Sequence, residues 1–139
     1  MVIPANARIV YVSGQVGLRA DGSLPDTLEA QADQAWQNLT ACIGETGMGP
    51  KNIVKINAYL IDADDYPAFA DARAKHIGDA RPASTAVLIK QLLLPEWRFE
   101  IDAVAAASQW VLLRRPGWGS EVDAQSAGVV LLVATRPRR

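Results

Sequence analysis

The sequence has few of the residues that build metal centres and covalent cross-links. Among 139 residues it contains one cysteine, Cys42, and one histidine, His76. A single cysteine excludes an internal disulfide framework. Cys42 lies in a helical pattern and fits as a small buried apolar side chain, with a reactive thiol as the alternative. One histidine and one cysteine do not supply the usual zinc ligand sets, so we expect no metal.

Long apolar runs and charge of one sign are also missing. No apolar run reaches the roughly 18 residues that span a bilayer. Residues 1–4 lack the charged and apolar regions of a secretory signal. Fourteen basic and 15 acidic residues give a net charge of −1, which offers no basic field for nucleic acid. We therefore expect a cytoplasmic protein that binds neither membranes nor nucleic acid.

Two common catalytic signatures are absent. Ser13 lacks the Gly-x-Ser-x-Gly pattern of a nucleophile elbow. Gly44, Gly47 and Gly49 do not follow a strand, so they do not indicate a phosphate-binding loop. Neither a serine hydrolase of that type nor a nucleotide-binding protein is predicted.

What is present is one globular domain of alternating strands and helices. Hydrophobic residues make up 50% of the chain, enough for a real core at this length. Periodicity predicts strands over 8–15, 52–61, 84–90 and 98–106, and helices over 27–46 and 66–77. Asp26 and Glu29 are spaced as a capping box at the first helix. This order predicts an α+β fold, with two helices on one face of a mixed sheet.

The strand over 98–106 organises this interpretation. Arg98, Glu100 and Asp102 alternate with apolar residues, so a strand places these three charges on one face. In the strand over 52–61, Lys55, Asn57 and Tyr59 alternate with apolar residues in the same way. Helices on one face leave the other uncovered, and an open apolar face is unusual on a monomer. We assign apolar surface for self-association to these residues: Val54, Ile56, Ala58, Leu60, Val87, Ile89, Ile101 and Ala103.

The chain changes character after residue 107. Residues 108–139 contain five arginines against Glu121 and Asp123, and glycines and prolines interrupt them. The apolar run 129–134 is long enough for one extra strand. We expect 1–107 to form the domain and 108–139 to be an atypical, poorly ordered C-terminal tail that the core does not need.

Several short motifs together resemble the RidA/YjgF family. They are Ser-Gly-Gln at 13–15, Arg-Pro-Ala at 81–83 and Glu-Ile-Asp-Ala at 100–103, in that order. The likeness covers about residues 8–106. It implies a chorismate mutase-like α+β fold and a homotrimer with clefts between subunits. It also implies hydrolysis of reactive enamines and imines, such as 2-aminoacrylate, to a keto acid and ammonia, without a metal or organic cofactor.

The resemblance also assigns roles to residues. Glu100 matches the glutamate that positions the water, and is the predicted catalytic residue. Gly14, Arg73, Ser84 and Ala86 fall at substrate-binding positions. Ser84 stands where active members have a carboxylate-binding arginine, Ala86 replaces a cysteine, and Arg73 replaces a frequent asparagine.

The missing arginine leaves alternatives open. A hydroxyl offers one neutral donor where a guanidinium makes two charge-assisted bonds, so a substrate carboxylate at Ser84 should bind at least about tenfold more weakly. Arg73, Arg81 and Arg98 are candidate substitutes, each with an ordinary surface charge as the alternative. The protein is therefore predicted to be a small imine or enamine hydrolase, with a non-catalytic trimeric ligand-binding module as the alternative.

Overall fold

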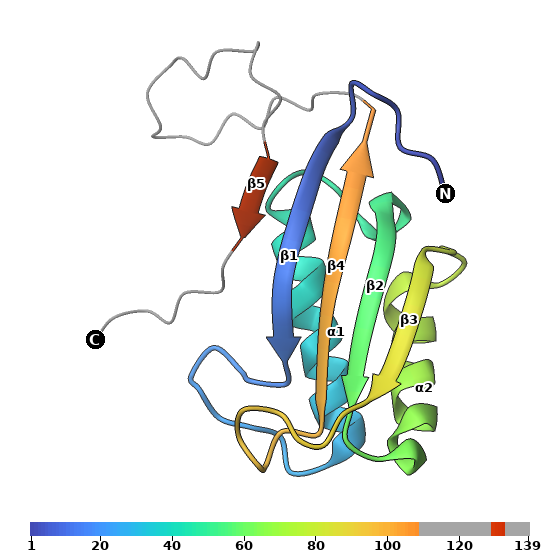
Figure 1. The fold of residues 1–139 in the computed structure, drawn as a ribbon. Coiled ribbons are helices and arrows are strands. Elements are labelled where there is room, and N and C mark those ends of the chain that lie inside the picture. Colours follow the sequence, from blue (N-terminus) through green and yellow to red (C-terminus); the bar gives the residue numbers. More distant parts are fainter. Residues whose placement is uncertain (109–128, 133–139) are drawn as a thin grey trace.

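The computed structural model describes residues 1–108 and 129–132, which form a five-stranded sheet with two helices against one face (Figure 1). The strand order is β3-β2-β4-β1-β5. The strands are β1 (Arg8–Val16), β2 (Ile53–Leu60), β3 (Ala83–Leu88), β4 (Phe99–Ala107) and β5 (Val129–Leu132). The predicted α+β fold is confirmed, and the ends of the six elements predicted before residue 108 are correct within two residues.

The two helices are α1 (Leu28–Gly44) and α2 (Tyr66–Ile77), with short 3-10 turns at Pro50–Asn52 and Ala63–Asp65. The expected cap at Asp26 is wrong. Thr27 is the N-cap instead, because its extended backbone lets its hydroxyl accept a hydrogen bond from the Ala30 amide at 3.3 Å. Pro67 lies in the first turn of α2, where a missing amide proton costs nothing.

The sheet is mixed because its edge strands run parallel to their neighbours. Strand β4 pairs antiparallel with both β1 and β2, while β3 pairs parallel with β2. Strand β5 pairs parallel with β1, from Ile9 opposite Val129 to Val12 opposite Leu132. The extra strand expected in 129–134 is therefore present over Val129–Leu132, and the rest of the expected tail lies outside the described residues.

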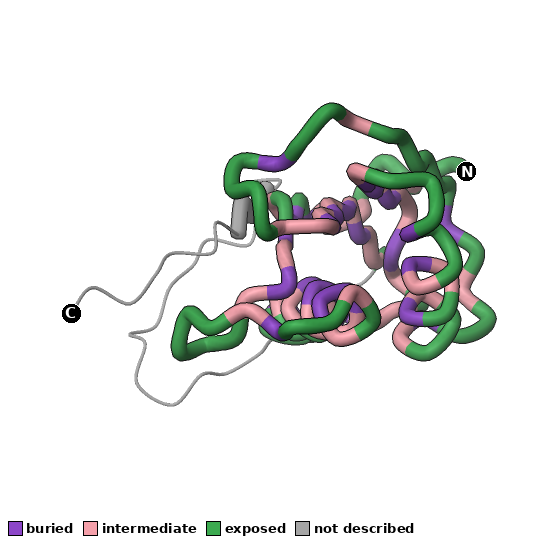
Figure 2. Tube along the Cα trace, turned by 90° about the horizontal axis from the view of Figure 1, so that it is seen from below, coloured by how far each residue is buried: buried purple, intermediate pink, exposed green. Residues whose placement is uncertain are grey.

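The core lies between the sheet and the helices, and Figure 2 marks the buried residues along the chain trace in purple. Trp36, Leu39 and Ile43 of α1 are fully buried there. Residues buried with them are Val10, Val12, Ile56, Ala58, Leu60, Phe69, Ala72, Phe99, Ile101, Ala103 and Ala105. Val54 does not join them, because the register of β2 shifts between Ile53 and Lys55 and Ile53 takes the buried position.

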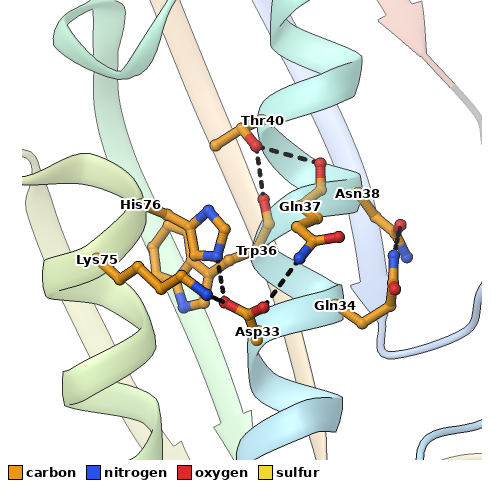
Figure 3. Close-up of polar contacts among 8 residues, drawn as sticks. All are labelled: Asp33, Gln34, Trp36, Gln37, Asn38, Thr40, Lys75 and His76. Atoms are coloured by element: carbon orange, nitrogen blue, oxygen red, sulfur yellow. Dashed lines mark hydrogen bonds and ion pairs between the residues drawn. The ribbon is translucent and has the colours of Figure 1, made fainter.

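A cluster of polar side chains joins the two helices on their outer side (Figure 3). Asp33 on α1 accepts hydrogen bonds from Lys75 Nζ at 2.7 Å and Gln37 Nε2 at 2.8 Å, and contacts His76 Nε2 at 2.6 Å. The His76 ring stacks on Trp36 with an angle of 7° between the planes. The single histidine therefore serves helix packing.

Candidate functional site

Glu100 lies on the sheet face that the helices leave uncovered. It is half-buried, between Phe99 and Ile101, which point into the core. The register of β1 shifts between Val12 and Gln15, and this irregularity brings Gly14 against the Glu100 side chain. A Cβ at Gly14 would overlap Oε1 of Glu100 and lie 2.7 Å from its Cδ, so glycine at this position allows the Glu100 side chain to keep its place.

The surroundings of Glu100 favour its protonated form. Burial raises the pKa of Glu100 above the ordinary 4.5, and the neighbouring charge of Asp102 raises it further. A carboxylate with a raised pKa is a stronger base when it is ionised. Such a group is suited to accept a proton from water near neutral pH.

A hydrogen-bonded group beside Glu100 holds Asp102 in place. Asn57 Nδ2 donates to one carboxylate oxygen of Asp102 at 2.8 Å, and the Tyr59 hydroxyl donates to the other at 3.0 Å. The hydrogen bond to Asp102, together with burial and nearby charge, raises the pKa of Tyr59. Sequence reasoning put these residues on the correct face but did not connect them. The connection needs the β2–β4 register, which pairs Asn57 with Asp102 and Tyr59 with Glu100.

Two of the predicted binding residues lie on the other face of the sheet. The β2–β3 register pairs Ser84 with Ile56 and Ala86 with Ala58, and both partners are buried beneath the helices. Paired residues share a face, so Ser84 and Ala86 point to the helix side. The alternate residue Thr85 faces the Glu100 side, where its hydroxyl contacts Lys55 Nζ at 2.5 Å. Within one protomer, Ser84 and Glu100 are therefore separated by the sheet.

The candidate cations are held in different ways. Arg73 belongs to α2, on the helix side with Ser84, and its buried Nε has no hydrogen-bond partner among the described residues. Arg81 donates to the carbonyl oxygens of Gly78 and Ala80 at 3.1 Å.

Arg98 does not share the Glu100 face, contrary to the prediction. Its guanidinium makes two bonds to Asp65, with Nη2 at 2.6 Å from Oδ1 and Nε at 3.1 Å from Oδ2. Arg98 precedes β4, so strand alternation does not fix its direction. The buried carboxylate of Asp65 needs an opposite charge and attracts it toward α2.

The predicted site residues thus form two groups. Gly14 and Glu100 are in contact on the uncovered face, Ser84 and Ala86 lie on the helix side of the edge strand β3, and Arg73 lies on α2. A pocket of about 500 Å³ lies elsewhere, between the N-terminal residues and the end of β4, and contains none of them. In the part of the chain that the structure describes, no group of His, Cys, Asp or Glu could hold a metal ion, and no helix could cross a membrane.

Comparison with known proteins gives consistent matches. A sequence profile of the Endoribonuclease L-PSP family matches residues 2–107. A 2-iminobutanoate/2-iminopropanoate deaminase of Capra hircus is 33% identical over 101 residues, which cover 70% of this chain and 72% of the goat protein. Protein MMF1, mitochondrial, of Saccharomyces cerevisiae is 33% identical over 86 residues, or 61% of this chain. That match spans 59% of the yeast protein, less than two thirds of its length.

Solved structures share the fold. The crystal structure of a putative endoribonuclease L-PSP from Entamoeba histolytica superposes with a TM-score of 0.68 at 28% identity, covering 76% of this chain and 90% of that one. RidA from the Antarctic bacterium Psychrobacter sp. PAMC 21119 has a TM-score of 0.67 at 26% identity, covering 76% and 85%.

Proposed function

The chain belongs to the Endoribonuclease L-PSP family and is a RidA/YjgF protein, and from this we propose that it hydrolyses reactive imines or enamines. The observation that carries the proposal is the close contact of Gly14 with a half-buried Glu100 of raised pKa. Relatives named 2-iminobutanoate/2-iminopropanoate deaminases supply the reaction type.

The reaction needs only water and a base. Water adds through its oxygen to the imine carbon, and Glu100 accepts a proton from it as the electrons of the C=N bond move to nitrogen. Protons then pass to that nitrogen, the C–N bond breaks, and ammonia leaves as the C=O bond forms. Because Glu100 must be ionised to accept the proton, kcat/KM should fall as the pH decreases through its raised pKa.

We propose that the complete site lies between two copies of the chain. Gly14 and Glu100 from one protomer would face the edge strand β3 of another, which carries Ser84 and Ala86, and Arg73 on α2 of that second copy would complete the site. Side chains on β3 are exposed along its whole length, so a second copy can reach them.

A mixing experiment tests this arrangement. Glu100→Gln and Arg73→Ala each inactivate a different half of the site, so oligomers reassembled from both variants should regain part of the activity. Either variant reassembled alone serves as the control. If the mixture shows no recovery, although it contains mixed oligomers, both groups act within one protomer and the proposal is wrong.

Ammonia release from freshly generated 2-aminoacrylate and its imine tests the activity. Wild-type protein should be active but weak, and Glu100→Gln should reduce the rate to background because an amide cannot accept the proton. Ser84→Arg should raise kcat/KM by one to two powers of ten, matching about 1.5–3 kcal/mol for a charged hydrogen bond. Binding of small ligands without turnover in any variant would favour the alternative, a non-catalytic binding module.

The family description also mentions a ribonuclease, and the structure does not favour that activity here. Glu100 and Asp102 place two carboxylates on the uncovered face, and the whole chain carries a net charge of −1. A phosphate backbone is attracted by clustered lysine and arginine side chains. Among the described residues this face has no such cluster, and Lys55 in the middle of β2 is the one basic side chain that the strands place on it.

A further inference from the structure

We propose that the arginines of residues 136–139, which read Arg-Pro-Arg-Arg, bind the substrate carboxylate at the Glu100 site. They would supply the cation that Ser84 does not provide. Residues 133–139 lie outside the described residues, and the end of β5 fixes where they begin. The inference rests on the proposed function for its reaction, whereas binding of an anion at Glu100 can be measured without turnover.

Strand β5 directs the chain toward the Glu100 end of the sheet. It runs parallel to β1, with Leu132 beside Val12, and both arrows in Figure 1 point to the end where β4 begins. Glu100 is the second residue of β4. Beyond Val12, β1 continues into the irregularity that places Gly14 against Glu100. The chain therefore leaves β5 at the end of the sheet that carries the site.

The distance from this exit to Glu100 is within reach of the first of these arginines. Strand β1 separates β5 from β4, so Leu132 lies two strand spacings, roughly 10 Å, from Ala103. Glu100 is three positions away from Ala103 along β4, which places it roughly 14 Å from Leu132. The four residues from Leu132 to Arg136 span up to about 14 Å when extended. The Arg136 guanidinium, at the end of a long side chain, can therefore reach a ligand beside Glu100.

The charges of the Glu100 face favour the approach of an arginine. Glu100 and Asp102 place two carboxylates on this face. Lys55 is the one basic side chain that the strands place there, and its ammonium contacts the Thr85 hydroxyl on β3, on the side of β2 away from β4. The positive charge of Lys55 is thus directed away from Glu100. An arginine from residues 136–139 would be attracted by the two carboxylates and would hold its guanidinium beside them.

The three arginines considered from the sequence do not provide this contact within one protomer. Arg98 is paired with Asp65, and Arg81 donates to backbone carbonyl oxygens. Arg73 is on α2, so it reaches the Glu100 face only from another copy. An imino carboxylate, the substrate type in the names of two relatives, needs an opposite charge beside it. The planar fork of an arginine matches a carboxylate in shape as well as in charge.

Binding of propionate tests this anchor without catalysis. Propionate is titrated into the wild type and into a glutamine variant, Arg136→Gln with Arg138→Gln and Arg139→Gln, while NMR follows the Gly14 amide. The dissociation constant should rise about tenfold in the glutamine variant, because a charged hydrogen bond is lost. The same three positions changed to lysine keep the charge without the fork, so that variant should lie between the two.

Two controls make the result specific to these arginines. Lys51→Gln with Lys75→Gln removes exposed positive charge from the far end of β2 and from α2, and should leave the dissociation constant unchanged. Propionamide, a neutral molecule with the same carbon frame, should bind the wild type and the glutamine variant equally. No binding of propionate to the wild type, or an equal dissociation constant in the glutamine variant, would overturn the inference. Tighter binding in the glutamine variant would also overturn it, because the arginines would then block the site.

Turnover separates this inference from the proposed function. Acetone imine differs from 2-iminopropanoate by a methyl group in place of the carboxylate. The glutamine variant should lose about tenfold in kcat/KM for 2-iminopropanoate and little for acetone imine. If the wild type hydrolyses neither imine while propionate binding weakens in the glutamine variant, the hydrolase proposal fails and the anchor holds. If both proteins hydrolyse 2-iminopropanoate equally well, the hydrolase proposal holds and the anchor is wrong.

Discussion

Gly14 and Glu100 show how the absence of one side chain shapes the candidate site. The β1 irregularity places the Gly14 backbone where any Cβ would displace the Glu100 carboxylate. Glycine is favoured at position 14 because the backbone comes close to the Glu100 side chain. Its φ angle is not the reason, since the described glycines with positive φ are Gly22, Gly47 and Gly78. The resemblance selected Gly14 as a binding residue, and the structure shows that it directly contacts the proposed base.

Gly14→Ala should therefore damage activity more than stability. The new methyl group would force Glu100 to another rotamer, and misplacing a base by about 1 Å can cost 10²-fold in rate. We expect at least a tenfold loss in kcat/KM, with helical content unchanged by circular dichroism. Gly49→Ala is the matched control, because no atom lies within 4 Å of its new Cβ. Full activity in Gly14→Ala would contradict the assigned contact.

Glu100 should also lower the stability of the folded protein at neutral pH. Its pKa is raised in the folded state, so the folded protein holds this proton more tightly than the unfolded chain. Stability then falls as pH rises from the ordinary pKa of 4.5 through the raised value. Glu100→Gln should raise the Tm by up to a few degrees at pH 7, and the difference should vanish below about pH 4. Thermal scans at pH 4 and 7 measure this, and a lower Tm in the variant at pH 7 would contradict it.

Among the elements, β4 is held at its start by Arg98 rather than by strand pairing alone. The ion pair between Arg98 and Asp65 ties the residue before β4 to the start of α2. Gln31 of α1 adds to it, since its side-chain oxygen accepts from the Arg98 amide at 3.2 Å and its amide donates to the Glu96 carbonyl at 3.3 Å. The loop before β4 is thus fixed to both helices.

Arg98→Ala should destabilise the protein by about 2–3 kcal/mol, because it leaves the buried Asp65 carboxylate unpaired. This is less than the 3–5 kcal/mol typical of a fully buried pair, since the Arg98 side chain is 41% exposed. Urea unfolding gives the value. Arg81→Ala, which removes a long, exposed contact to Asp79, should change little. Equal effects of the two substitutions would show that burial of Asp65 does not matter.

The second element of interest is β5, which covers the edge of β1. It supplies the backbone partner for residues 9–12, whereas the core described in residues 1–108 packs among β1–β4, α1 and α2. Deleting residues 108–139 should therefore keep the fold and change the Tm by a few degrees, equivalent to about 1 kcal/mol. Loss of soluble, folded protein after the deletion would show that β5 is essential and that the tail belongs to the domain.

At the scale of the whole molecule, most of the residues expected to provide apolar surface for self-association are not on the surface. Ile56, Ala58, Leu60, Ile101 and Ala103 are buried beneath the helices, because they occupy the inward positions of their strands. Four exposed apolar side chains lie at β3 and the loop after it, namely Val87, Leu88, Leu93 and Leu94, and others are Met1, Val2, Tyr11 and Tyr66. In the group at β3, Leu93 is 85% exposed. A surface of this kind is typical of a contact between proteins.

We predict that the chain forms a homotrimer that buries this surface. Light scattering at micromolar concentration should give three times the chain mass of 15.0 kDa. Leu93→Lys together with Leu88→Lys should weaken the assembly while leaving the protomer folded, because both side chains are exposed in it. A monomer mass for the wild type would refute the trimer and the shared site.

The expected cytoplasmic location also stays a prediction, since the yeast relative MMF1 is mitochondrial.

The sequence by itself determined the order and type of the elements, and it singled out Glu100 as the candidate catalytic residue. The alternation around Glu100 and the helical spacing around Trp36 are local patterns, and local periodicity follows from backbone geometry. The short motifs were sufficient to indicate the family, which the match over residues 2–107 confirms. The sequence placed Asp102 on one strand face and Asn57 and Tyr59 on another, but it did not predict their hydrogen bonds. Those bonds depend on the register between β2 and β4, which are far apart in the sequence.

Only the tertiary structure decided which predicted residues meet. Arg98 turned to Asp65 because a buried carboxylate needs a partner that strand alternation cannot reveal. Ser84 went to the opposite face from Glu100 because the parallel β2–β3 register places it beside Ile56. Faces across a sheet are set by long-range pairing, and a one-residue change in register inverts them. The candidate residues can therefore be found along the chain. Only the folded sheet shows that Gly14 lies against Glu100 and that Ser84 lies on the opposite face.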